Sequence, residues 1–267
     1  MSGYHDIEVE RIGPVARISH NRPELRNAEN TRLLEEMMDA AERASRDDGV
    51  RVIVIAGKGD HFSAGHDLKE GASRRDFTVE QRYAHEERLF YDFCLKIWDA
   101  PKPTICQVQG ACVAAGFMLA NMCDLIVASE DAFFADPVVQ TLGAAAVEVL
   151  IHPTVLGHRL AMDMLYTGRR LTAAEGLSCG MVSRLVARSD LETATLELAN
   201  QIAKAPPFAL KLVKRSLHRA LDMQGFRAAL DAHFDTHQLS HATQEFKETW
   251  ERGLSSGITR GKSAMRR

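Results

Sequence analysis

Residues 52–68 read VIVIAGKGDHFSAGHDL and residues 104–119 read TICQVQGACVAAGFML. The first stretch begins with an uninterrupted apolar run, as expected of a β-strand buried on both faces, and TICQV predicts a second strand. Each strand leads into a loop of small residues and glycines. Ligands of α/β proteins gather at the carboxyl ends of the strands. The two stretches therefore predict an α/β fold with a binding site where segments 61–68 and 110–119 meet.

The second loop continues into Phe117–Met122, which favours a helix. A helix start leaves backbone N–H groups without partners, and the helix dipole favours negative charge there. A pair of such N–H groups is what the oxygen of a polarised carbonyl requires. Close packing of a strand against a helix also explains the glycines. The residues alone leave both interpretations open.

The surrounding sequence extends the α/β prediction. Ile7–Ile12 and Val15–His20 alternate apolar and polar residues around a Gly-Pro pair, which favours a β-hairpin. Asn30–Ser45 has an apolar helical face that Asn30 or Thr31 could cap. Strand, helix and strand in succession favour crossover connections and a parallel sheet. Further strands are predicted at Leu125–Ala128, Ala132–Phe134 and Val182–Val186, and further helices at Glu80–Trp98, Arg159–Tyr166, Thr172–Ser178, Leu191–Lys204, Phe208–Ala220, Gly225–Leu239 and Thr243–Leu254.

Composition excludes several classes of protein. The chain has 267 residues and a net charge of −3, which gives no basic footprint for nucleic acid and no polybasic patch for a membrane. No apolar run approaches the roughly 20 residues that span a bilayer. The five cysteines show no CxxC spacing, and the acidic N-terminus lacks the features of a signal peptide. We therefore expect free thiols and a cytoplasmic protein.

Several ordered motifs then identify a family. They are NRPELRNA at 21–28, HFSAGHDL at 61–68, PKPTI at 101–105, GACVAAGFMLANMCD at 110–124, LYTGR at 165–169 and GMVS at 180–183. Together they resemble the enoyl-CoA hydratase/isomerase (crotonase) superfamily, from about Glu8 to Lys214. The resemblance implies a crotonase-like ββα spiral core at residues 1–200 that binds acyl-CoA, followed by a C-terminal helical trimerisation region at 201–267. It also implies a homotrimer or a dimer of trimers.

The resemblance assigns roles to residues in both loops. The backbone N–H groups of His66 and Ala115 would hold the thioester oxygen and stabilise an enolate. The remaining residues that it assigns to binding of the CoA and acyl groups are Arg26, Ala64, Asp67, Leu68, Gly116, Met118 and Val138. Arg26 lies in the segment that approaches the CoA phosphates. The coenzyme A thioester is the substrate, and the family uses neither another cofactor nor a metal.

The chain departs from the family at the chemistry of hydration. A standard hydratase uses two glutamates as general acid and base. Their positions are occupied here by Met118 and Val138, neither of which can carry a proton. A standard hydratase activity is therefore not expected. Met118, Val138, Val139, Phe117 and Leu142 instead suggest an apolar acyl pocket.

Other titratable residues could move a proton. Glu148 is the first candidate, because some family members that shift double bonds carry a lone carboxylate close to this position; the alternative is a surface or interface glutamate. Asp136 is either an acid or a structural cap. His66 could orient the acyl group or a water, and His152 could share a helix face with Glu148. We therefore expect an acyl-CoA enzyme, most simply a double-bond isomerase. The alternatives are a divergent hydratase, lyase or hydrolase that uses Asp136 or His66, and a non-catalytic acyl-CoA-binding or scaffold protein.

One histidine pattern stands apart from these motifs. His233, His237 and His241 recur at every fourth position of a predicted helix, so they share a face. This spacing can bind zinc. No carboxylate motif accompanies the histidines, so we expect a solvated or interface stripe and no metal.

Overall fold

The main sheet confirms the predicted α/β class. The computed structural model describes residues 3–74 and 76–248. Its six-stranded sheet has the order β1 (Ile7–Ile12), β2 (Val15–His20), β3 (Val52–Gly57), β4 (Thr104–Val108), β6 (Leu125–Ser129) and β9 (Arg184–Val186). The hairpin β1–β2 is antiparallel and every other pairing is parallel. Strands β3 and β4 are buried along their whole length and end side by side, as their apolar sequences predict.

A second sheet contains three short strands: β5 (Ala111–Val113), β7 (Phe133–Ala135) and β8 (Arg170–Thr172). Strand β5 pairs with β7 in parallel, and β7 pairs with β8 antiparallel. The sequence predicted β7 one residue early and missed β5 and β8. Runs of three residues are too short to show a strand period. Strand β5 matters for the site, because it lies inside the second glycine loop.

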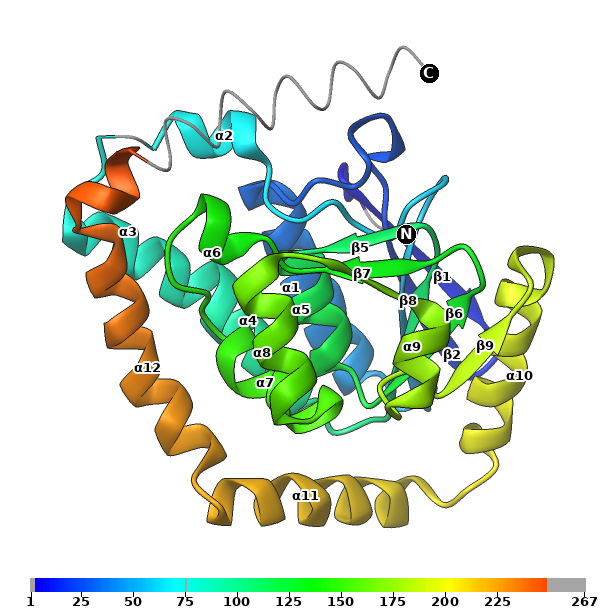
Figure 1. Ribbon diagram of the computed structural model, residues 1–267. Coiled ribbons are helices and arrows are strands. Elements are labelled where there is room, and N and C mark those ends of the chain that lie inside the picture. The colour runs from blue at the N-terminus through cyan, green and yellow to red at the C-terminus, as the bar shows by residue number, and fades with distance from the viewer. Residues whose placement is uncertain (1–2, 75, 249–267) are drawn as a thin grey trace.

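Helices cover both faces of the main sheet (Figure 1). One face packs against α1 (Thr31–Arg46), α4 (Asp92–Trp98) and α5 (Ala115–Met122), and the other packs against α10 (Leu191–Ala203). Asn30 caps α1 as expected, because its side chain accepts a hydrogen bond from the backbone N–H of Leu33 at 2.8 Å. All residues of α5 are buried, so α5 is the central helix of the fold.

The predicted helix Glu80–Trp98 is present but not regular. It consists of α3 (Val79–Glu86), a π-helical turn η2 (Glu87–Tyr91) and α4. A π turn inserts one extra residue and rotates the side chains that precede it relative to those that follow. Leu89, Phe90 and Tyr91 lie in this turn and are buried. Such turns concentrate at functional sites, and Glu86 and Phe90 both reach the cavity described below.

The remaining helices surround the second sheet or form the C-terminal region. They are α2 (Leu68–Ala72), α6 (Val138–Thr141), α7 (Glu148–Leu156), α8 (His158–Thr167), α9 (Ala173–Ser178), α11 (Pro207–Met223) and α12 (Phe226–His241), with 3-10 turns at Pro23–Leu25 and Arg188–Asp190. Figure 1 shows α11 along the lower edge and α12 returning along the side toward α3. The predicted helix Thr243–Leu254 lies partly outside the described residues, and the division into 1–200 and 201–267 stays a prediction.

Two further expectations concern helices and thiols. Among the described residues, no helix has both the length and the apolar character needed to cross a bilayer. All five cysteines are free, and four of them are buried.

Candidate active site

The two glycine loops pair with each other, as the sequence predicted. The backbone N–H of Ser63 donates to the carbonyl of Ala111 at 3.1 Å, and the N–H of Val113 donates to the carbonyl of Ser63 at 3.0 Å. One residue earlier, the N–H of Phe62 donates to the carbonyl of Gln109 at 2.8 Å. The loop after β3 therefore runs beside β5, and its following residues lie against the start of α5.

Two glycines make this approach possible. Gly65 has φ +81°, and a Cβ atom there would lie 2.7 Å from the carbonyl oxygen of Val113 and 2.9 Å from the Cβ of Ala114. A Cβ on Gly116 would lie 2.6 Å from the Cβ of Ser63. Both contacts are too short for any side chain. Close packing, one of the two interpretations left open by the sequence, therefore holds for these glycines, and it brings two backbone segments into contact.

The same contact leaves two backbone N–H groups without acceptors. The backbone of Glu29 is hydrogen-bonded to both neighbours of His66. Its N–H donates to the carbonyl of Gly65 at 2.8 Å, and its carbonyl accepts from the N–H of Asp67 at 3.0 Å. Within the described residues the N–H of His66 has no acceptor. Ala115 is the first residue of α5, so its N–H precedes the bonds of the helix. A Cβ on Gly65 would lie 3.3 Å from the nitrogen of Ala115, so the two N–H groups belong to adjoining segments.

The turn that presents Ala115 is strained. Ala114 has φ +49° and ψ −120°, a conformation that residues with a Cβ rarely adopt. Its N–H donates to the carbonyl of Ala135 at 2.9 Å, which anchors the turn to β7. Backbone strain of this kind costs about 1–3 kcal/mol and concentrates at active sites.

A cavity of about 60 Å³ adjoins these loops, with room for a few water molecules. Segment 66–71, the helices α3, α5, α6, α7 and α12 and the π turn contribute to its wall. The lining residues are Glu29, His66, Asp67, Leu68, Gly71, Arg74, Phe77, Arg82, His85, Glu86, Phe90, Met118, Val138, Leu142, Ala146, Glu148, His237 and His241.

This cavity corrects the prediction of an apolar pocket. Met118, Val138 and Leu142 do line it, but more than half of the other lining residues are titratable. Phe117 is fully buried against Phe134 and His152 instead, and Val139 is 45% exposed. The sequence pattern identified apolar residues near the site but could not show that α3 and α12 bring charged side chains to the same wall.

Glu148 lies on the cavity wall at the start of α7. Its side chain is 2% exposed, and its Oε2 atom has no hydrogen-bond partner within the described residues. Burial, together with the negative charge of Asp136, raises the pKa of Glu148 to about 8. Glu148 is therefore mostly protonated at neutral pH, which suits a group that stores a proton. The alternative of a surface glutamate is wrong.

Asp136 has other partners. It is fully buried, and its Oδ1 accepts from the backbone N–H of Val138 at 3.1 Å, which is the role of a structural cap at α6. Its Oδ2 accepts from His152 Nε2 at 3.1 Å, and His152 Nδ1 accepts from Asn121 at 3.0 Å. Neither Asp136 nor His152 is among the residues that line the cavity. His152 shares α7 with Glu148 but contacts Asp136.

His66 lines the cavity and packs edge-on against Phe90, with ring centroids 4.3 Å apart. Burial lowers the pKa of His66, although the charge of Glu86 opposes this effect. The imidazole is therefore neutral at neutral pH. It lies beside its own backbone N–H and could contact an acyl group held there.

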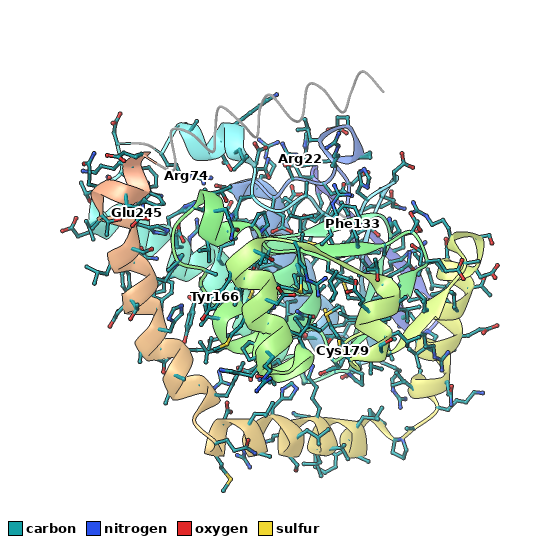
Figure 2. The ribbon with its side chains drawn as sticks, in the orientation of Figure 1. Arg22, Arg74, Phe133, Tyr166, Cys179 and Glu245 are labelled. Carbon is teal, nitrogen blue, oxygen red and sulfur yellow. The ribbon has the colours of Figure 1, made fainter. Side chains whose placement is uncertain are left out.

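The predicted CoA-binding residues lie around the first loop. Asp67 caps α2 through the N–H groups of Lys69 and Glu70, and it pairs with Arg22 at 2.9 Å. Leu68 is the first residue of α2 and lines the cavity. Figure 2 labels Arg22 near this loop and Arg74 between α2 and α12.

Arg26 and Ala64 are joined through their backbones, because the N–H of Ala64 donates to the carbonyl of Arg26 at 2.9 Å. Arg26 has φ +53° and does not line the cavity. The CoA-binding roles of these residues remain predictions.

Sequence reasoning missed several cavity residues. Glu29 is 3% exposed, accepts a hydrogen bond from Ser63 Oγ at 2.9 Å, and has a pKa that burial raises to about 7. Its place directly after the NRPELRNA motif was the available signal. His85, Glu86 and Phe90 also line the cavity, and they lie directly before or within the π turn. No pattern in the sequence predicted this turn.

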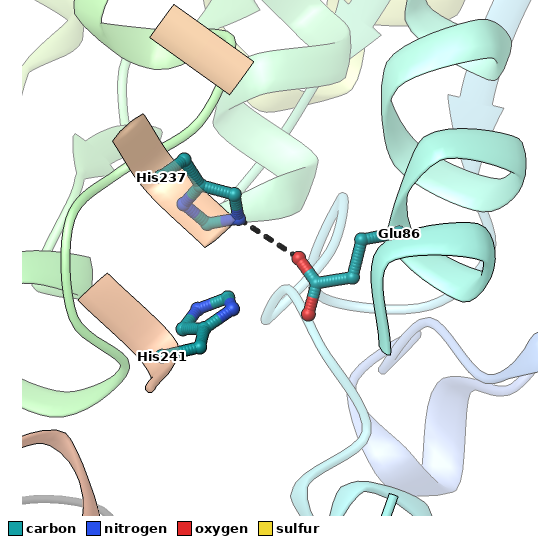
Figure 3. Close-up of side chains that lie close together, drawn as sticks. All are labelled: Glu86, His237 and His241. Atoms are coloured by element: carbon teal, nitrogen blue, oxygen red, sulfur yellow. Dashed lines mark hydrogen bonds and ion pairs between the residues drawn. The ribbon is translucent and has the colours of Figure 1, made fainter. Parts of the chain in front are cut away.

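His237 and His241, two residues of the histidine stripe of α12, lie beside Glu86 of α3 (Figure 3). His233 Nε2 donates to the carbonyl of Ala145 at 2.8 Å, and His237 Nε2 donates to Glu86 at 2.9 Å. His241 Nε2 donates to the carbonyl of Leu142 at 3.2 Å. His237 is buried, and His233 and His241 are half-buried, so the stripe lies at an interface between α12, α3 and the loop before α7.

The charges within this group are linked. Burial opposes ionisation of Glu86, but the hydrogen bond from His237 and the charges of nearby histidines lower its pKa to about 2. Burial is the largest single influence on His237 and opposes its ionisation, but the hydrogen bond and charge of Glu86, together with the hydrogen bond to Ala144 and the charge of Glu148, raise its pKa. Burial lowers the pKa of His241 to about 4.

Comparisons with known proteins agree with this geometry. Residues 10–256 match the family described as Enoyl-CoA hydratase/isomerase. A putative enoyl-CoA hydratase, EchA13, from Mycobacterium tuberculosis is 40% identical over 86% of this chain and 78% of its own length. A 4-chlorobenzoyl coenzyme A dehalogenase from Arthrobacter is 33% identical over 80% of this chain and 78% of its own.

The crystal structure of a probable enoyl-CoA hydratase from Mycobacterium smegmatis has a TM-score of 0.83 and 45% identity, covering 88% of this chain and 94% of that one. The predicted crotonase-like architecture is thereby confirmed. The family match at residues 10–256 spans both paired loops. The chain therefore belongs to the enoyl-CoA hydratase/isomerase family.

Proposed function

We propose that the protein is an acyl-CoA enzyme that stabilises a thioester enolate and moves one proton through Glu148, most simply as a double-bond isomerase. The observation that carries this proposal is a buried, mostly protonated carboxyl group with an unpartnered oxygen, on a cavity beside two unpartnered backbone N–H groups.

In this proposal the N–H groups of His66 and Ala115 receive the thioester oxygen. Negative charge develops on that oxygen when a proton leaves the α or γ carbon of an enoyl thioester. Fixed N–H dipoles stabilise this charge without reorganisation, and removing one such donor typically reduces kcat by about 10²–10³. The strained turn at Ala114 supports the assignment, because it holds the N–H of Ala115 in position before substrate binds.

Glu148 would take the proton from one carbon and return it to another. As an anion it accepts the proton, and its raised pKa makes the protonated form a suitable donor in the next step. Met118 and Val138 line the same cavity and carry no proton, so activation of water has no second carboxylate at these positions. A shift of the double bond needs one such group, whereas hydration needs two.

The other residues keep supporting roles in the proposal. Arg26, Ala64, Asp67 and Leu68 bind the CoA moiety, and Gly116, Met118 and Val138 surround the acyl group. The CoA thioester is the substrate and no organic cofactor takes part. Asp136 is the alternative acid, but its two oxygens already accept from Val138 and His152.

The test replaces Glu148 with glutamine, which keeps the shape and removes the acid. Turnover is measured on a panel of 2-enoyl- and 3-enoyl-CoA esters by following the conjugated thioester in the ultraviolet. We expect kcat to fall by about 10²–10⁴, the usual contribution of a general acid–base. Glu197→Gln, on the exposed face of α10, is the matched control and should keep wild-type kcat.

Each outcome of the panel is informative. Full turnover by E148Q on any active substrate removes Glu148 from the mechanism and favours His66 or Asp136 in a hydratase, lyase or hydrolase. Saturable binding of CoA esters by calorimetry, with no reaction of the wild-type protein across the panel, favours the non-catalytic binding protein.

Self-association through α11, as a homotrimer or a dimer of trimers, is a further part of the proposal. Of its 17 residues only Lys214 is buried. Large apolar side chains on it are exposed, including Phe208 at 69% and Leu217 at 64%. Such exposure on one helix is typical of an interface. Light scattering coupled to gel filtration should give three or six subunits for the wild type and a smaller assembly for Leu217→Glu. A monomeric wild type would exclude this part.

A further inference from the structure

Three side chains outside the proposed proton transfer converge at one end of the cavity. Glu86 ends α3, while His237 and His241 lie one turn apart on α12 (Figure 3). The potential ligand atoms of these three residues all lie within 4.8 Å of one another. Among the described residues, no other group of three or more His, Cys, Asp or Glu side chains has this property.

Hydrogen bonds to the backbone orient both imidazoles. His237 Nδ1 donates to the carbonyl of Ala144, and His241 Nε2 donates to the carbonyl of Leu142 at 3.2 Å. These bonds fix the tautomers and leave His237 Nε2 and His241 Nδ1 on the inner side. Histidine ligands of metal ions are held by the same kind of bond from the outer nitrogen to a carbonyl.

The inner nitrogens differ in their present partners. His237 Nε2 donates to Glu86 at 2.9 Å, so a proton bridges these two groups. His241 Nδ1 is buried and has no hydrogen-bond partner within the described residues. A buried nitrogen lone pair without a donor costs free energy unless something else binds it. A cation bound here would take the place of the bridging proton and would also satisfy His241.

We propose that Glu86, His237 and His241 form a binding site for a divalent transition-metal cation of the Zn²⁺ type. Two imidazoles and one carboxylate, with the histidines four positions apart on a helix, are a donor set that zinc prefers in sites with one open position. Zn–N and Zn–O bonds of about 2.0–2.1 Å in a tetrahedron place the ligand atoms about 3.3 Å apart. In the structure His237 Nε2 and Glu86 Oε2 are 2.9 Å apart, and all three ligand atoms lie within 4.8 Å of one another. Small side-chain rotations would bring them to the tetrahedral spacing.

The two oxygens of the Glu86 carboxylate have different charged neighbours. Arg82 Nη1 lies 3.9 Å from Glu86 Oε1, whereas Glu86 Oε2 faces His237. One oxygen is thus oriented by a guanidinium and the other is directed to the ligand position, the arrangement that supports carboxylate ligands elsewhere. All three proposed ligands line the cavity, so the fourth position of the ion would open into the cavity that Glu148 and His66 also line. The site goes beyond the proposed isomerase chemistry, which uses no metal.

The experiment is an isothermal titration of ZnCl₂ into the untagged, full-length protein after treatment with a chelator, in the absence of any acyl-CoA. We expect one ion per chain. His241→Ala should weaken binding by at least about a hundredfold, because it removes a ligand rather than an outer partner. His233→Ala is the matched control: it lies on the same face of α12 but binds only the carbonyl of Ala145, and it should keep the wild-type affinity.

Two further measurements decide the matter if His241→Ala does not fold. Glu86→Gln removes the anionic ligand and should weaken zinc binding to a similar extent. Co²⁺ added to the wild-type protein should give the intense visible absorption of a four-coordinate site, which ZnCl₂ then abolishes. No saturable zinc binding by the wild type, equal binding by wild type and Glu86→Gln, or the weak spectrum of hydrated Co²⁺ would each overturn the site. Because no acyl-CoA is present, any of these results leaves the role of Glu148 untouched.

Discussion

Replacing Glu148 with glutamine should change how the stability of the protein depends on pH. Glu148 has a folded-state pKa of about 8 against an ordinary value of 4.5. Between these values the folded protein keeps a proton that the unfolded chain has released. The unfolded state therefore binds fewer protons, and the free energy of unfolding falls as pH rises through this window. The glutamine variant has no such titration.

The magnitude follows from the shift in pKa. Each pKa unit corresponds to about 1.4 kcal/mol, so the full shift sets an upper limit of about 5 kcal/mol. The cavity beside Glu148 admits water, which reduces the cost of ionisation. Only part of the shift falls inside the measured window, so we expect the stability of the variant relative to the wild type to rise by about 2–3.5 kcal/mol between pH 5 and pH 8. In the wild type the charge of Asp136 raises the pKa of Glu148 and the charge of His237 lowers it. Glu29 and His66 are present in both proteins, so their contributions to the pH dependence of stability largely cancel in the difference.

The assay is urea unfolding of both proteins at pH 5, 6, 7 and 8 and at one protein concentration, with linear extrapolation to water. Glu197→Gln should follow the wild-type profile at every pH, because its side chain is exposed on α10. A difference between E148Q and wild type that stays constant across this range would refute the reasoning. It would mean that Glu148 ionises with an ordinary pKa in the folded protein.

Two substitutions test the architecture of the loops. Gly65→Ala should destabilise the protein by more than about 1–2 kcal/mol, the usual cost of left-handed backbone, because the new Cβ would also lie 2.7 Å from the carbonyl oxygen of Val113. In thermal unfolding the control is Gly13→Ala, where φ is +56° and no atom lies near the new Cβ. Asn27→Ala should cost about 3 kcal/mol in urea unfolding, because the buried side chain donates to the carbonyls of Lys58 and His61 and accepts from Arg22; unchanged stability would contradict this account.

The local sequence was enough to predict the paired loops. A buried strand followed by glycines implies a close backbone approach, and Gly65 and Gly116 have contacts that no side chain would allow. The positions of Met118, Val138 and Glu148 on one cavity also follow the family resemblance. The depth at which Glu148 is buried does not follow from it, because that depends on how α7 packs against α5.

The far wall of the cavity could not be predicted from local patterns. Glu86 and His237 are 151 positions apart in sequence and meet only because α12 returns along α3. The π turn at Glu87–Tyr91 adds a further change, since it alters which residues of a predicted single helix face inward. The periodic pattern showed that the histidines share a face, but not that this face packs against α3 and the loop before α7. A strand of three residues, such as β5, is also too short to be predicted from the alternation of apolar and polar residues.

Met118 and Val138, at the positions where the family resemblance places the glutamates of a hydratase, and the raised pKa of Glu148 belong to one physical arrangement. Met118 and Val138 are 3% and 4% exposed and present apolar surface to the cavity that Glu148 shares. Apolar neighbours disfavour the carboxylate, and they keep Glu148 mostly protonated near neutral pH. A glutamate at position 118 would add a further acid to the cavity that Glu148 lines, and its negative charge would also act on Glu148. In the proposed mechanism a single group both gives and receives a proton, which matches a reaction in which no water is added. On this proposal, the two residues that disfavour hydration would also favour a shift of the double bond.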